Sequence, residues 1–293
     1  MGLPINITLG LDKLVETFAN ATGLTALGKI MNAKGEAKAE ALLSKKRAET
    51  DAEVEILKIQ GQEKVAQYVL ARNSQKVENV GGILSKAEQQ FSPDEQVSNE
   101  PVDKDWMTRF LNIAEEVSDN EMQELWARVL AGEVKQPKSY SLRTLEVLKN
   151  ISKEEADIIV KTAVYVYELN YICIEDFALN LNDKILLDDL GIVCGEDLIH
   201  TVSLNEKKRN FPVNHNIVFN VYADANIKFD IQCIKMTKAG SEIMRLVQDI
   251  DYQKFLQSLA SKIKNQGATK ITYNKIIKWE GSKYTYLDPG IEI

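Results

Sequence analysis

The residues best suited to chemistry lie close together in one short segment. Cys194, Glu196, Asp197 and His200 are near neighbours along the chain, and a histidine beside carboxylates can act as a general base or as half of a metal site. A single cluster of this kind, without a second partner group, is more often a solvated loop. None of these residues is therefore nominated as catalytic.

The rest of the chain offers little further material for catalysis. Its 293 residues include only three cysteines, Cys173, Cys194 and Cys233, and two histidines, His200 and His215. Phosphate-binding, dinucleotide-binding, zinc-protease and nucleophile-elbow motifs are not found in the sequence. The formal net charge of −7 argues against a bulk electrostatic grip on nucleic acid. We expect a protein that is not an enzyme and that needs no metal or cofactor.

An apolar segment, residues 1–31, opens the chain. Its apolar residues recur at helical spacing, which predicts an amphipathic helix with one apolar face. Two interpretations stand side by side: a helix docked on a core, or a membrane-active helix at a lipid surface. The residues that would carry the membrane activity are Leu11, Leu14, Val15, Phe18, Leu24, Leu27 and Ile30.

Residues 32–90 interleave acidic and basic side chains with alanine and contain no proline. This pattern predicts one long solvated helix, a rod of roughly 75 Å for about 50 residues, with Gly81-Gly82 as a hinge near its end. Its apolar stripe is thin, which favours packing against another helix or another subunit. A single exposed helix that only separates two ends is the alternative. The expected association residues are Ile56, Ile59, Val69 and Leu70.

A linker is predicted at 91–103, where two prolines, serine and acidic residues gather. Residues 104–170 then show helical spacing of apolar residues and are expected to form a helical bundle. Ser118 and Ser152 each precede a glutamate by three residues, the signature of a capping box. Ser141 is expected to cap a further helix.

Residues 171–293 are mixed in pattern and predict an α+β, winged-helix-like module. Two β-rich runs within 215–236 are expected to pair as a hairpin, a further helix is expected over about 252–265, and a last pair of strands over 271–288. The basic residues Lys207, Lys208 and Arg209 are candidates for nucleic-acid contact. Aromatic residues interleaved in the manner of RNA-binding motifs are not evident, so this role stays an alternative. The fold class expected overall is mainly α with a C-terminal α+β module.

The most specific pattern lies at 125–158. It contains Trp126-Ala127, Gly132-Glu133, a helix start at Ser141, Arg143 and Thr144, and a helix end at Leu148-Lys149 followed by Ile151-Ser152. In this order these features resemble an uncharacterised bacterial domain family that is similar to the abortive-infection alpha proteins. The resemblance extends over 1–170 and implies a role in phage defence, without catalytic residues to transfer. Physically the motif is structural, since Trp126 suits a core and Gly132 a helix C-terminus.

These features together predict a bacterial anti-phage effector. The chain would sense a phage-encoded protein, form a homo-oligomer and disrupt the membrane through residues 1–31, because many weak apolar segments act together when their copies are joined. It would reside in the cytoplasm and associate with the inner membrane on activation. The alternatives are a winged-helix DNA-binding regulator that uses residues 171–293 and a passive oligomeric scaffold.

Overall fold

A computed structural model describes most of the chain and divides it into two compact units. The units are Met1–Leu145 (unit 1) and Glu146–Ile293 (unit 2), and each is described by itself. The predicted rod and the first half of the predicted bundle thus belong to one unit. The described residues are 13–14, 17, 36–59, 63–92, 97–174, 179–205, 207–213, 216–248, 250–280 and 283–293.

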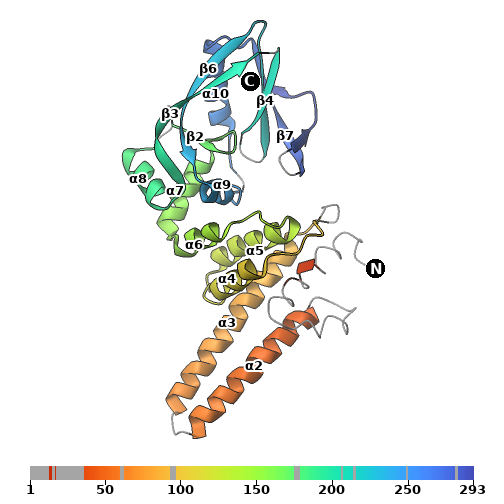
Figure 1. Cartoon of the computed structure of the whole chain (residues 1–293), viewed down its shortest axis with the longest axis vertical. Coiled ribbons are helices and arrows are strands. Elements are labelled where there is room, and N and C mark those ends of the chain that lie inside the picture. Colours follow the sequence, from red (N-terminus) through yellow and green to blue (C-terminus); the bar gives the residue numbers. More distant parts are fainter. Residues whose placement is uncertain are drawn as a thin grey trace. The chain divides into compact units, whose positions relative to one another are not determined.

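Unit 1 begins, in its described helices, with two that lie side by side, α2 (Glu36–Ile59) and α3 (Glu63–Gln89) (Figure 1). The prediction of one continuous rod is therefore wrong, and the two helices form a hairpin. Gly81 and Gly82 do not form a hinge, since both lie within α3. Thr50 and Val54 of α2 are buried, and their spacing of four residues places them on one helix face. The thin apolar stripe of α2 is thus covered by α3 of the same chain.

The remaining helices of unit 1 form a bundle around α3. They are α4 (Lys104–Ala114), α5 (Asn120–Lys135) and the start of α6 (Leu142–Asn150). Trp106 stacks on Phe110 with ring centroids 5.3 Å apart, and Phe110 meets the edge of Trp126 at 5.7 Å. These three rings are buried together with Ile83 of α3. Helices therefore form where the apolar spacing predicts them, but the bundle of unit 1 includes α3, and the predicted bundle range 104–170 is divided between the two units.

Helix capping explains where these helices begin. Asp103 and Asp119 accept hydrogen bonds from backbone amides three residues ahead and start α4 and α5. The predicted box at Ser118 is therefore wrong by one residue, because Asp119 supplies the capping oxygen. Ser152 forms the complete capping box with Glu155 that the sequence predicts.

Unit 2 contains helices and two antiparallel sheets. Its helices after α6 are α7 (Lys153–Ala163), α8 (Leu181–Asp189), α9 (Lys238–Met244) and α10 (Gln253–Asn265). Its strands are β1 (Val166–Tyr167), β2 (Tyr171–Cys173), β3 (Val193–Leu204), β4 (Lys208–Val213), β5 (Ile217–Tyr222), β6 (Ile227–Met236), β7 (Lys270–Glu280), β8 (Lys283–Tyr286) and β9 (Ile291–Glu292).

Strand order separates the two sheets clearly. One sheet runs β1-β2-β6-β3, and the other runs β4-β5-β7-β8 with β9 also paired to β7. Both β5 and β6 form where the sequence predicts strands, but they do not pair with each other. Residues 224–226 therefore connect two sheets, and the predicted hairpin is wrong. The last predicted pair of strands does form, since β7 pairs antiparallel with β8. A mainly α chain with a C-terminal α+β module is confirmed, and the winged-helix-like topology stays a prediction.

The core of unit 2 lies between the sheets and α10. Phe211 and Phe219 of one sheet, Phe229 of the other and Phe255 of α10 belong to one buried cluster. The alternation of side chains along each strand sends every second residue into this cluster. The other residues of β4, β5, β7 and β8 consequently form an outer face, which is described below.

Candidate interaction surfaces

The α2–α3 hairpin carries an unusual group of exposed apolar side chains where the two helices approach their connection. Ile56 is 57% exposed and Tyr68 is 63% exposed, and Val65 and Leu70 are also exposed. We call these four residues the hairpin end. Contiguous exposed apolar side chains often mark a surface that contacts another protein or a membrane.

The hairpin end faces more than one direction. Val65 and Tyr68 are three residues apart and share one face of α3. Leu70 lies five residues after Val65, which turns it about 140° around the helix. Apolar contacts are therefore offered on two sides of α3, so one hairpin can contact more than one neighbour.

The predicted association residues are placed only partly at this surface. Ile56 and Leu70 belong to it, while Val69 is half-buried and the side chain of Ile59 lies outside the described residues. Val65 and Tyr68 were not predicted, because they fall outside the stripe that a single continuous helix would present.

Of the predicted membrane-active residues, only Leu14 is described. It is 2% exposed, Thr17 beside it is buried, and the ammonium of Lys13 donates a hydrogen bond to the carbonyl oxygen of Ser98. These contacts agree with the docked-helix interpretation for this short stretch, and Leu14 does not face a lipid surface in this state. Outside the described residues lie Leu11, Val15, Phe18, Leu24, Leu27 and Ile30.

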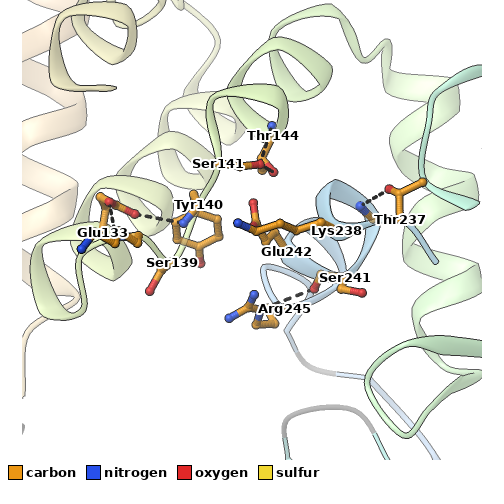
Figure 2. A network of polar contacts seen from close by, with 12 residues as sticks. Glu133, Ser139, Tyr140, Ser141, Thr144, Thr237, Lys238, Ser241, Glu242 and Arg245 are labelled. Carbon is orange, nitrogen blue, oxygen red and sulfur yellow. Dashed lines mark hydrogen bonds and ion pairs between the residues drawn. The ribbon is translucent and has the colours of Figure 1, made fainter. Parts of the chain in front are cut away.

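Residues of the motif at 125–158 fix the loop between α5 and α6 through hydrogen bonds (Figure 2). The buried carboxylate of Glu133 accepts hydrogen bonds from the backbone amides of Lys138, at 2.6 Å, and Tyr140, at 2.9 Å. A Cβ added to Gly132 would lie 2.7 Å from the Tyr140 ring, so only glycine allows this approach. The Gly-Glu pair therefore positions a turn in which Lys138 has a φ of 72°.

Other motif residues are structural as well. Trp126 is fully buried, and the hydroxyl of Ser141 accepts a hydrogen bond from the backbone amide of Thr144 at 3.4 Å, at the start of α6. Arg143 is exposed on the first turn of that helix. The motif thus specifies a fold, and Arg143, Lys149 and Ser152 are exposed members of it.

The candidate chemical cluster is not assembled into one site. The carboxylate of Asp197 forms an ion pair with Lys184 at 2.7 Å, whereas His200 stacks on Tyr171 with ring centroids 4.7 Å apart. His200 Nδ1 lies 3.9 Å from a carboxylate oxygen of Glu168 in the β1–β2 turn. Within the described residues, no group of three or more His, Cys, Asp or Glu side chains is arranged to hold a metal ion.

The three predicted basic residues diverge in the structure. Arg209 donates a hydrogen bond to the carbonyl oxygen of Ser203 at 3.0 Å and lies 3.5 Å from Glu168, so it joins the two sheets. Lys208 faces the opposite way, onto the outer face of β4, β5, β7 and β8. Lys207 is exposed just before β4. The basic run is therefore not one continuous patch.

Around Lys208 the outer face is rich in aromatic rings. The Lys208 ammonium lies 5.4 Å from the ring centroid of Tyr222 and 5.7 Å from that of Tyr286. The ring centroids of Tyr284 and Tyr286 lie 6.3 Å apart, and those of Trp279 and Tyr284 lie 5.2 Å apart. We call these five residues the aromatic–basic face. The spacing of residues along the chain does not reveal this face, because the rings come from strands far apart in the chain.

The cysteines differ in accessibility, which gives a direct prediction. Cys194 is exposed, and Cys173 and Cys233 are buried; burial raises the pKa of the Cys233 thiol to about 11. Because the thiolate is the reactive form, iodoacetamide at pH 7.5 is expected to alkylate one thiol per native chain, Cys194. Peptide mass spectrometry checks this, and all three thiols should react in guanidinium. Equal native labelling of Cys233 would contradict the buried placement.

Comparison with known proteins finds one similarity. Residues 63–171, from α3 to β2, match a family described as a protein of unknown function (DUF2806), and this part contains the motif and the bundle. Neither a curated protein nor a solved structure matches the chain. Among the helices that the structure describes, none is long and apolar enough to cross a membrane.

Proposed function

We propose that the chain is a self-associating, non-enzymatic effector protein whose protomers join through the hairpin end. The observation that carries the proposal is the exposure of Ile56, Val65, Tyr68 and Leu70 on a hairpin whose inner face is already covered within the chain. The occupant we propose is a second copy of the same hairpin. Acidic and basic residues interleave along α2, and α3 contains residues of both signs, so the surrounding surface of one copy is compatible with that of another.

The geometry favours an assembly larger than a dimer. Four partly exposed side chains cover less area than the roughly 800 Å² per partner of a typical stable interface. Apolar contacts on two sides of α3 allow each hairpin to meet two neighbours, and such head-to-tail contacts produce rings or filaments. Many weak contacts then add up through avidity.

The resemblance supplies the biological setting of this proposal. Similarity to the abortive-infection alpha proteins suggests phage defence, in which a phage-encoded protein triggers assembly and residues 1–31 act on the inner membrane. The buried Leu14 supports a resting state in which part of this segment is docked on unit 1. Assembly would then have to release it before several copies engage lipid together.

A charge placed in the hairpin end should prevent assembly. Tyr68→Glu is expected to lower the weight-average mass of the full-length protein toward that of the monomer, because it puts a carboxylate into an apolar contact. Sedimentation velocity over a range of protein concentrations measures this. Gln67→Glu is the matched control, since it adds the same charge at the neighbouring exposed position of α3 and removes no apolar surface.

Two outcomes would overturn this proposal. The wild-type chain could remain monomeric at every concentration tested, or both variants could assemble as the wild type does. Dye leakage from anionic liposomes, with and without lysate of phage-infected cells, tests the membrane step. Leakage by the wild type but not by Tyr68→Glu is expected. Unchanged leakage by a monomeric Tyr68→Glu would instead place lipid, not a second copy, against the hairpin end.

A further inference from the structure

The outer face of the β4-β5-β7-β8 sheet combines half-exposed aromatic rings with positive charge. Trp279, Tyr284, Tyr286 and Tyr222 are each half-exposed, and Lys208 lies between the last two rings. By the strand register, Lys208 and Lys270 lie on the same face as these rings, because both are paired with Tyr222. The ammonium of Lys270 lies 3.2 Å from the carboxylate of Glu292 in β9.

The tyrosine rings are held in place by their hydroxyl groups. The Tyr286 hydroxyl donates to Asn220 Oδ1 at 3.2 Å and accepts from Asn210 Nδ2 at 3.2 Å. The Tyr284 hydroxyl donates to the Oδ1 atom of Asn210 at 3.1 Å. Because the polar end of each side chain is engaged inward, what the sheet presents outward is ring surface.

The asparagines beneath are themselves fixed. Asn220 is fully buried and donates to Asn274 Oδ1 at 2.8 Å, and Asn274 in turn donates to the carbonyl oxygen of Leu287. A Cβ on Gly290 would lie 2.5 Å from Asn274 Oδ1, so the segment after β8 passes close over this network. The rings therefore stand on a rigid base and lose little freedom on binding, which favours affinity.

We propose that the aromatic–basic face binds single-stranded nucleic acid. Bases stack on aromatic rings irrespective of sequence, while lysines neutralise the phosphates, and sheets with exposed rings bind two or three bases in this way. A duplex hides the faces of its bases within the stack, so single strands are the better match for exposed rings. Lys208 supplies positive charge on the same face as the rings, where its ammonium lies over Tyr222 and Tyr286. This inference is independent of assembly through the hairpin end.

Fluorescence anisotropy of the full-length protein with labelled dT15, U15 and a 15-base-pair duplex tests this proposal. Both single strands are expected to bind more tightly than the duplex, with an affinity that falls steeply between 50 and 200 mM salt. Trp279→Ala should weaken binding about tenfold or more, and Trp279→Phe should retain most of it, because the stacking surface is kept. Lys208→Gln should also reduce the salt dependence, because Lys208 lies among the rings.

Matched controls separate a specific face from general charge. Lys235→Gln removes an exposed lysine from β6, in the other sheet, and should leave binding unchanged. The proposal is overturned if no single strand binds at 50 mM salt, if duplex binds as tightly as dT15, or if Lys235→Gln weakens binding as much as Lys208→Gln. It is also overturned if Trp279→Ala, with an unchanged circular dichroism spectrum, binds as the wild type does.

Discussion

Gly240→Ala is expected to destabilise unit 2 severely, although it adds only one methyl group. A Cβ at this position would lie 1.9 Å from the carbonyl oxygen of Ile192, and a backbone atom cannot turn away as a side chain can. The same backbone also accepts hydrogen bonds from Thr237, the N-cap of α9. We expect the free energy of unfolding of unit 2 to fall by more than about 4 kcal/mol, as it does in a severe steric conflict.

Denaturant unfolding of the full-length chain measures the effect of Gly240→Ala, with Trp279 as the fluorophore within unit 2. The control is Gly81→Ala, since nothing lies within 4 Å of a Cβ at this helical position of α3. That variant should be as stable as the wild type or more stable by about 1 kcal/mol, because alanine favours a helix over glycine. A wild-type unfolding midpoint for Gly240→Ala would show that α9 does not approach Ile192 so closely.

Glu133→Ala is expected to destabilise unit 1 by about 3 kcal/mol. The change leaves the amides of Lys138 and Tyr140 without the carboxylate that accepts their hydrogen bonds, and each unsatisfied buried group costs about 1–3 kcal/mol. It also releases the turn in which Lys138 has a positive φ. The fluorescence of the buried residues Trp106 and Trp126 follows the unfolding of this unit.

Glu133→Gln provides the comparison for this position. Glutamine keeps one acceptor oxygen and the size of the side chain, so it should recover part of the stability that alanine loses. If alanine and glutamine were equally harmless, the Gly132-Glu133 pair would have no structural role. A loss of stability with both, but larger with alanine, is the pattern that the two hydrogen bonds require.

Local signals in the sequence predicted much of unit 1. The bundle follows from apolar residues at helical spacing around Phe110 and Trp126. In unit 2, Ser152 begins α7 as its capping box requires. The hairpin was missed because α2 and α3 have the same charged, alanine-rich composition, which shows no boundary between them. Where the rod was expected to bend, at Gly81 and Gly82, α3 continues and Gly82 packs against Gln123.

Pairing in unit 2 is a non-local property, and this is why the sequence misled there. Strands β5 and β6 are adjacent in the chain and each shows a β-rich pattern, yet β5 pairs with β4 and β7 while β6 pairs with β2 and β3. The strand β3 itself was overlooked because charged residues such as Glu196 and Asp197 occupy it. A strand with much of its length exposed to water shows no continuous apolar run.

The two candidate surfaces are also non-local properties of the fold. Ile56 and Leu70 could be predicted as exposed apolar residues of a charged helix, but Val65 and Tyr68 join them only because the chain reverses direction. The aromatic–basic face could not be predicted from spacing at all, since Tyr222 and Trp279 are separated by more than fifty positions in the sequence. Both surfaces depend on contacts that only the folded chain creates.

The hairpin also influences which parts of unit 1 open locally. Many described residues near the hairpin end are exposed, whereas Val129, Leu130 and Val134 of α5 are completely buried. Protection of backbone amides against hydrogen exchange depends on such burial. The connecting ends of α2 and α3 should therefore exchange in local openings, while α5 exchanges only when the whole unit unfolds. Assembly would extend slow exchange outward along the hairpin, so the exchange rate of each amide would report how far neighbouring protomers overlap.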